Sequence, residues 1–199
     1  MVEIVISRFN EDISWINGLN CKITIYNKGE PCGFNAIKLE NVGREATTIL
    51  YHIINNYTNL AEYTAFLQGN PFEHAKNAKQ IISALPNNIS KLYKFSEGCY
   101  AIADKILNET QSSISKFNVF PEDFYKTFFL QPNSKFFYAS GAQYLVHRDN
   151  IKNKEIGFYK TILNSYEWKN HEPWSIERNW PMIFDREDKY KHKQAKMFL

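Results

Sequence analysis

The sequence has few of the features that mark secreted, metal-binding or hydrolytic proteins. It contains only three cysteines, which lie far apart in the chain: Cys21, Cys32 and Cys99. An odd number of separated cysteines predicts neither a disulfide framework nor a zinc site, and it favours the reduced interior of a cell. The five histidines include no H-x-x-x-H pair, and the chain has neither a G-x-S-x-G motif nor a P-loop.

Long hydrophobic runs are also missing. No window of about 18 apolar residues occurs, so we expect no transmembrane helix. Met1 leads directly into the mainly apolar residues 2–6, without the charged segment and long apolar run of a secretory leader. We therefore expect a cytoplasmic protein.

Charge is weak and spread out. The formal net charge is +3, and lysine and arginine form no basic stripe, so we expect no nucleic-acid partner. The basic run at residues 189–193 is typical of a solvated end. A mild positive balance suits an anionic small molecule such as a nucleotide.

What the chain does contain is enough apolar material for one core. Its 199 residues favour a single domain, residues 1–199. Apolar residues make up 44% of the chain and aromatic residues 16%. Aromatic side chains dominate the burial of most cores, and some of these could instead line a ligand cleft.

The hydrophobic pattern predicts strands that alternate with helices. We expect strands at residues 2–6, 22–26, 63–67, 135–138 and 142–146. We expect a short helix containing Trp15 and Ile16, which Asp12 could cap. We expect further helices at residues 46–57, 73–85 and 151–163, around Ile102 and Ile106, after Pro121, and at 174–184. The fold class is therefore α/β: a mixed, mostly parallel central sheet flanked by helices on both faces.

Polar loops follow the three early strands, and they are the first candidate site: Ser7-Arg8-Phe9-Asn10, Asn27-Lys28-Gly29 and Gln68-Gly69-Asn70. If the strands are parallel neighbours, these loops gather at the carboxyl edge of the sheet, where α/β proteins commonly bind ligands. Arg8 and Lys28 could pair with phosphates, and Gly29 and Gly69 would let backbone approach closely. The same residues are also ordinary turn formers.

Two further features lie near helices. Asn41-Val42-Gly43-Arg44-Glu45 precedes the helix at residues 46–57, where free N–H groups favour an anion; a solvated helix cap is the alternative. Glu177 would share a helix face with Trp174, Pro181 and Phe184, and loss of hydration there would raise its pKa, as a general base needs. The alternative is a structural Glu–Arg pair, and Pro181 could break the helix.

The small-residue turn Ser140-Gly141-Ala142-Gln143 separates two predicted strands. A sugar could lie against the backbone of such a turn, or the turn could be a plain hairpin.

Blocks that cover most of the chain resemble a fungal and bacterial family of unknown function. The blocks are residues 5–15, 25–29, 41–45, 66–69, 141–148 and 177–184, and only about residues 87–133 lack one. That family resembles glycosyltransferases of the A-type fold, a single Rossmann-like α/β domain.

The resemblance implies a nucleotide-sugar donor, often a UDP-sugar, and a glycan or other hydroxyl acceptor. Ser7, Arg8 and Asn10 would lie near the base and ribose, with Asn27, Lys28, Asn41, Gly43 and Arg44 completing the donor site. Gly141, Ala142, Gln143 and Trp180 would lie near the acceptor. Glu177 falls where such enzymes carry an acidic residue, often the catalytic base of inverting members.

One block departs from the pattern of such enzymes. Gln68-Gly69-Asn70 stands in the place of the Asp-x-Asp motif, whose carboxylates hold a divalent ion that neutralises the leaving diphosphate. Neutral Gln68 and Asn70 should bind Mg²⁺ or Mn²⁺ weakly. Either Arg8, Lys28 or Arg44 serves the diphosphate without metal, or the metal is held elsewhere, or catalysis has been lost.

The leading hypothesis is a glycosyltransferase, and the rival is a non-catalytic module that binds nucleotide sugars or glycans. A hydrolase that uses Glu177 with Asp12 or Asp149 is a more distant alternative, because the sequence shows no evident carboxylate pair.

Overall fold

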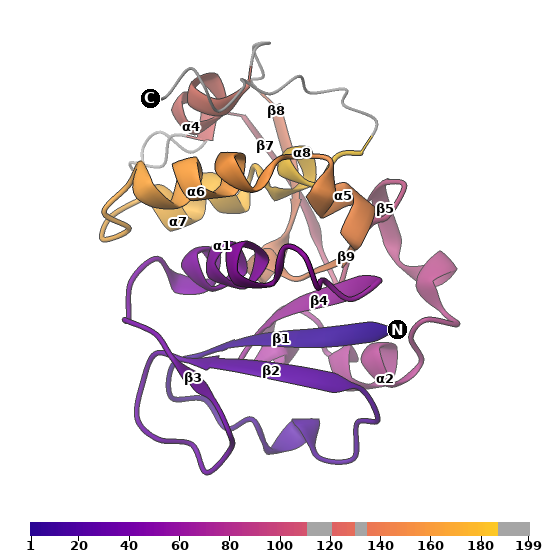
Figure 1. Ribbon diagram of the computed structural model, residues 1–199. Coiled ribbons are helices and arrows are strands. Elements are labelled where there is room, and N and C mark those ends of the chain that lie inside the picture. The colour runs from indigo at the N-terminus through magenta and orange to yellow at the C-terminus, as the bar shows by residue number, and fades with distance from the viewer. Residues whose placement is uncertain (111–120, 130–134, 187–199) are drawn as a thin grey trace.

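A seven-stranded sheet forms the centre of the computed structural model, which describes residues 1–110, 121–129 and 135–186 (Figure 1). The strand order is β3-β2-β1-β4-β9-β6-β5. The strands are β1 (Val2–Arg8), β2 (Lys22–Asn27), β3 (Ile37–Lys38), β4 (Tyr63–Gln68), β5 (Tyr93–Ser96), β6 (Cys99–Ala101) and β9 (Tyr144–His147). Two further strands, β7 (Ile106–Thr110) and β8 (Lys135–Ala139), form a separate antiparallel ribbon.

The strands β1, β2 and β4 were expected to be parallel neighbours, and the structure confirms this. β1 pairs with β2 on one side and with β4 on the other, both in parallel, and β2 pairs in parallel with β3. The register places Ser7 beside both Tyr26 and Gln68. The pairings of β4 with β9, β9 with β6, and β6 with β5 are antiparallel. The sheet is thus mixed, as predicted, but only half of its pairings are parallel.

The helices and 3-10 turns cover the sheet on both faces. They are η1 (Ser14–Ile16), α1 (Arg44–Asn56), η2 (Pro71–Glu73), α2 (Ala78–Ser83), η3 (Ile89–Lys91), α4 (Pro121–Phe128), η5 (Ser140–Ala142), α5 (Arg148–Lys152), α6 (Ile156–Asn164), α7 (Glu172–Glu177) and α8 (Trp180–Ile183). Figure 1 shows α1 directly on one face of the sheet, with α6 and α7 stacked on the outer side of α1.

Two hydrophobic cores result from the alternation of side chains along the strands. Val5 of β1 packs with Ile49 and Leu50 on the α1 side, whereas Ile4 and Ile6 pack on the opposite face. Within the described residues, no helix has both the length and the apolar composition needed to span a bilayer.

Several predicted elements differ from those observed. The segment around Ile102 and Ile106 is not helical. Ile102 follows β6 and donates its N–H to the Gln143 carbonyl at 2.9 Å, and Ile106 begins β7. The spacing of four residues between the two isoleucines is therefore not a helical period. The helix expected at residues 73–85 is only α2, since Pro71–Glu73 forms a separate 3-10 turn.

Two predicted helices are each divided. Residues 151–163 fall in α5 and α6, which are separated at Asn153–Glu155. Residues 174–184 fall in α7 and α8, because Pro181 has no N–H to donate to the Glu177 carbonyl. The helix predicted after Pro121 is present as α4.

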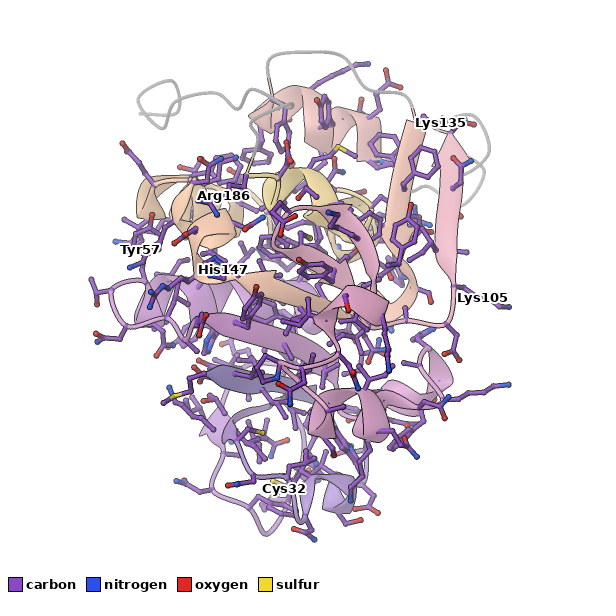
Figure 2. The ribbon with its side chains drawn as sticks, turned by 90° about the vertical axis from the view of Figure 1, so that its right-hand side faces the viewer. Cys32, Tyr57, Lys105, Lys135, His147 and Arg186 are labelled. Carbon is purple, nitrogen blue, oxygen red and sulfur yellow. The ribbon has the colours of Figure 1, made fainter. Side chains whose placement is uncertain are left out.

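Ser140-Gly141 is not a hairpin turn. β8 pairs with β7 in the ribbon and β9 lies in the main sheet, so η5 carries the chain from one sheet to the other. Figure 2 shows the ribbon standing beside the main sheet, with Lys105 and Lys135 near its opposite ends. The basic run at residues 189–193 and parts of the segment 87–133 lie outside the described residues.

Candidate functional site

The chain reverses its direction of travel across the sheet between β1 and β4. From β1 it moves outward to β2 and β3, and then it returns to the other side of β1 as β4. α1 begins at Arg44 after β3, and β4 ends at Gln68, so both ends lie at the carboxyl edge of the parallel strands. Ligands of open α/β sheets bind at this kind of switch point.

A pocket of about 230 Å³ lies at this edge. It is lined by Arg44, Glu45, Ala46, Gln68, His74, Gly141, Ala142, Pro173, Trp174, Glu177 and Trp180. The structure thus brings together residues that the sequence placed in two separate groups. Arg44 and Gln68 were expected at the donor, and Gly141, Ala142, Trp180 and Glu177 at the acceptor or as the base.

Glu177 is the last residue of α7, and its side chain is 19% exposed. Its Oε1 accepts the N–H of Gly141 at 2.9 Å, and its Oε2 lies 3.7 Å from Nη1 of Arg178. Burial raises the pKa of Glu177 to about 7, and the charge of Glu45 adds to this, while Arg178, the Gly141 N–H and Arg44 oppose it. The carboxylate is therefore held in one position and changes charge near neutral pH.

Backbone strain gathers around the pocket. In the ranges that the structure describes, three non-glycine residues have positive φ: Arg44 (48°), Ala142 (52°) and Trp168 (60°). Two of them line the pocket, and the carbonyl of Trp168 accepts the N–H of Gly43, just before α1, at 2.9 Å. Strain of this kind persists only where surrounding structure imposes it, and it is frequent at functional sites.

Glu45 is a second carboxylate in the pocket. Its Oε1 accepts Nε2 of Gln68 at 2.8 Å, and its Oε2 lies 3.6 Å from Nε of Arg44. The Arg44 guanidinium also lies over the Trp174 ring, 5.5 Å from its centre. The start of α1 and the start of α7 thus face each other across the pocket.

Lys28 does not reach the pocket. Its buried ammonium donates to the carbonyls of Val42 and Arg44 and, at 2.7 Å, to the hydroxyl of Thr47. Burial lowers its pKa to about 8, against the opposing charge of Glu45. An ammonium has three protons, so these three acceptors leave none for a ligand.

Arg8 and Asn27 join the loops after β1 and β2. Arg8 is 7% exposed and donates to Oδ1 of Asn27 at 2.7 Å, and also to the carbonyls of Phe9, Glu11 and Glu30. Asn27 donates in turn to the Glu30 carbonyl at 2.9 Å. We call this cluster the loop knot: Arg8, Asn27 and the carbonyls they bind.

Asn10 adds to the loop knot, because its Oδ1 accepts the N–H of Glu30 at 2.9 Å. Ser7 lies under α1, with its Oγ 2.9 Å from the hydroxyl of Thr48. Asn41 is exposed in the loop before α1, and Gly43 forms the N-cap of α1 in a left-handed conformation. None of these four lines the pocket.

The remaining predicted residues also have internal partners. The carbonyl of Gly69 accepts Nε1 of Trp15 at 2.8 Å, and Asn70 caps η2 by accepting the N–H of Phe72. Gln143 is fully buried, and its Nε2 donates to the carbonyls of Pro71 and Ile102, both at 3.2 Å.

The residues at the place of the Asp-x-Asp motif do not fit a divalent cation. Gln68 presents its amide N–H group to Glu45, and Asn70 uses its carbonyl as a helix cap. Mg²⁺ and Mn²⁺ favour carboxylate oxygens. Within the described part of the chain, no group of three His, Cys, Asp or Glu side chains is arranged to hold a metal ion.

The sequence did not single out Glu45, His74, Pro173 or Trp174 as site residues. Each of them was close to a predicted feature, since Glu45 follows Arg44 and His74 lies four residues after Asn70. These four residues belong to one pocket because η2, η5 and α7 lie at the same edge of the sheet as the start of α1, which only the structure shows.

Comparisons with known proteins give a family but no described relative. No curated protein and no solved structure matches the chain. One family model, described as a protein of unknown function, matches residues 4–198. The chain therefore belongs to the DUF3431 family of proteins of unknown function.

Proposed function

We propose that this protein is a glycosyltransferase of the A-type fold. It transfers a sugar from a nucleotide-sugar donor, in this proposal a UDP-sugar, to a hydroxyl of a glycan or another acceptor. The observation that carries the proposal is Glu177: a fixed carboxylate with a pKa raised to about 7, in a pocket at the switch point of an α/β sheet.

Glu177 is the general base of this reaction. In its ionised form it takes the proton of the acceptor hydroxyl as the oxygen attacks the anomeric carbon. The Gly141 N–H, at 2.9 Å, orients one carboxylate oxygen and leaves the other toward the pocket and Arg178. A base with a pKa near the working pH combines a useful ionised fraction with a strong tendency to accept the proton.

The size and lining of the pocket suit a single sugar ring. At about 230 Å³ it is smaller than the range of about 300–1,000 Å³ usual for drug-sized ligands, so the nucleotide of a donor would extend beyond it. Trp174 lines it with a side chain that is 38% exposed, and such a ring can pack against the apolar face of a sugar.

Arg44 is the predicted cation best placed for the diphosphate. It lines the pocket at the start of α1, where backbone N–H groups also favour an anion, whereas Lys28 has three internal acceptors and Arg8 donates to Asn27 and to backbone carbonyls. Mg²⁺ or Mn²⁺ has no suitable ligands at Gln68 and Asn70, so no step is assigned to a metal.

The Glu177→Gln variant tests the proposed base. We expect it to lower kcat by about 10²- to 10⁴-fold, because it removes the proton acceptor while keeping the shape of the side chain. KM for the UDP-sugar should change little. In the wild type, kcat/KM should rise as the pH increases through about 7, where Glu177 ionises. Release of UDP from a panel of UDP-sugars and acceptors measures these effects.

Glu172→Gln is the matched control, because Glu172 begins the same helix but does not line the pocket. It should keep the wild-type rate. Full transfer activity in Glu177→Gln would contradict the assignment of the base.

A non-catalytic nucleotide-sugar or glycan-binding module is the second candidate. The neutral pair Gln68 and Asn70, together with the internal use of Arg8 and Lys28, favours it. Calorimetry with UDP-sugars, with and without Mn²⁺, followed by a donor-hydrolysis assay, separates the two functions. Tight binding without turnover on any acceptor would identify the module, and a complete failure to bind nucleotides would exclude both nucleotide-dependent functions.

A further inference from the structure

We propose that His74 is the proton donor for the leaving diphosphate, acting beside Arg44 in the place that a divalent cation takes in related chemistry. This inference rests on the proposed glycosyl transfer and adds a second catalytic residue to it. The geometry that carries it is a half-buried imidazole that lines the pocket and has no hydrogen-bond or ion-pair partner among the residues that the structure describes.

The main chain of His74 is fixed while its ring is left free. Its N–H donates to the Pro71 carbonyl at 3.2 Å, and its carbonyl accepts the N–H of Asp104 at 2.7 Å. Among the described residues, neither ring nitrogen makes a hydrogen bond or an ion pair. A polar side chain that is partly removed from water and unpaired carries a free-energy cost, which a bound ligand can offset.

Gly141 lies against both acid–base groups. A Cβ atom added to Gly141 would lie only 2.3 Å from Cδ2 of His74, so the imidazole lies directly against this glycine. The N–H of the same glycine donates to Glu177 at 2.9 Å. His74 and Glu177 are therefore held in the same pocket through contacts with one strained turn.

The leaving group requires positive charge that the rest of the site supplies only in part. A nucleoside diphosphate gains negative charge on a phosphate oxygen as it departs, and preorganised donors stabilise that charge. The positive charge of Arg44 is partly offset by Glu45, whose Oε2 lies 3.6 Å from Nε of Arg44. Gln68 and Asn70 are neutral. His74 is the remaining pocket side chain that can carry a proton to an anion.

The proposed step is balanced as follows. The bond between the anomeric carbon and the phosphate oxygen breaks, and its electron pair goes to that oxygen. The protonated imidazole of His74 gives its proton to the same oxygen, while the acceptor oxygen bonds to the anomeric carbon and loses its proton to Glu177. Exchange with solvent then returns a proton to His74 and removes one from Glu177.

The charges that face His74 come from several elements. Arg44 and Glu45 of α1 and Glu177 of α7 line the pocket with it, and Glu73 and Asp104 flank its own backbone. A diphosphate would add negative charge to this set. A negative charge beside an imidazole favours its protonated form, so a bound diphosphate should favour the protonated ring of His74.

The experiment is titration calorimetry of UDP at pH 7.5 in EDTA, in two buffers with different ionisation enthalpies. We expect the wild type and Glu177→Gln to take up a proton as they bind UDP. We expect His74→Gln in the Glu177→Gln background to take up none, because that background removes the proton that Glu177 could itself take up. His74→Gln should also bind UDP about 10-fold more weakly, because it loses a charge-assisted hydrogen bond. Its kcat should fall by about 10²-fold or more.

The failures of the two proposals are distinguishable. Proton uptake that is unchanged when His74→Gln is added to Glu177→Gln, or absent from the wild type, would overturn the role of His74 and leave the transferase proposal standing. If the wild type does not bind UDP, the transferase proposal itself fails. His171→Gln is the matched histidine control, since His171 is exposed outside this pocket, and thermal unfolding confirms that all variants remain folded.

Discussion

Gly141 occupies a position where a side chain would meet two separate obstacles. Its φ of +77° is costly for residues with a Cβ atom, and the added atom would lie 2.3 Å from the His74 ring. Gly18 has a similar φ of +82° but open space around it. Comparison of substitutions at the two glycines therefore separates the cost of backbone strain from the cost of steric conflict.

We expect Gly141→Ala to lower the free energy of unfolding by about 2–4 kcal/mol and to disturb the pocket, whereas Gly18→Ala should cost only about 1–2 kcal/mol. Urea denaturation of both variants measures the difference. His74→Ala removes the ring, so the double variant with Gly141→Ala should recover the steric part of the loss. Simple additivity of the two changes would show that the ring and the glycine are not in contact.

Prediction from sequence succeeded at the residue scale where the physical cause was local. Glu177 lay among tryptophans in the sequence, which favoured burial and a raised pKa, and its pKa is raised to about 7. The free ring of His74 could not be anticipated, because it depends on which groups other segments bring to it. The local pattern showed only an isolated histidine near a turn.

At the scale of elements, the loops after β1 and β2 and the start of α1 have different structural roles. The loop knot uses the guanidinium of Arg8 to join two loops, while Arg44 is only lightly constrained, with a side chain that is 55% exposed. Sequence alone treated both arginines as candidates for the diphosphate. The contacts that distinguish them join distant segments, since Arg8 donates to the loop after β2 and Arg44 lies over the ring of Trp174.

We therefore expect the two arginines to respond in opposite ways to substitution by methionine. Arg8→Met should lower the free energy of unfolding by about 2–4 kcal/mol, since it leaves buried acceptors without donors. Arg44→Met should change stability by no more than about 0.5 kcal/mol but weaken UDP binding about 10-fold or more. Denaturation and calorimetry on the same samples measure both; an unchanged stability in Arg8→Met would mean that the loop knot is not structural.

The division between α7 and α8 also belongs to this scale. Pro181 predicted a break, and the break ends α7 at Glu177, which places the carboxylate at a helix end against η5. If α7 continued without a break, Glu177 would not lie at a helix end against η5. The local rule for proline was sufficient here, but the identity of the facing turn was not available from the sequence.

At the scale of the whole molecule, the β7–β8 ribbon is joined to the pocket through Arg178. This buried arginine donates to Glu109 of β7 at 2.8 Å and lies over the ring of Tyr138 of β8, 4.8 Å from its centre. It also lies 3.7 Å from the carboxylate of Glu177. The ribbon thus fixes a charge that favours the ionised form of the proposed base.

Arg178→Met should raise the pKa of Glu177 further above its ordinary value, because a positive charge that favours ionisation is lost. The rising limb of kcat/KM should then move to higher pH, so that activity at pH 7 falls more than activity at pH 9. Stability should fall by about 2 kcal/mol, since Glu109 loses its charged partner and keeps the hydrogen bond from the Tyr138 hydroxyl.

The pH profile of Arg178→Met distinguishes the electrostatic effect from a loss of folded protein, which would scale all rates equally. Lys169→Met is a suitable control, because Lys169 is exposed and its ion pair within the described residues is with an exposed Glu167. A limb that stays at the wild-type position would show that Arg178 does not influence the base.

The sequence by itself determined the class of fold, the parallel arrangement of the first strands and the candidates Glu177, Arg44 and Gln68. These follow from periodicity, strand burial and local turn chemistry, which act over a few residues. Only the tertiary structure decided that Arg8 and Lys28 are internal donors, that residues 102–106 belong to strands and loop, and that His74 and Glu45 join the pocket. Those outcomes depend on contacts between segments far apart in the chain, because a hydrogen bond or a pocket forms wherever the packed sheet brings its partners together.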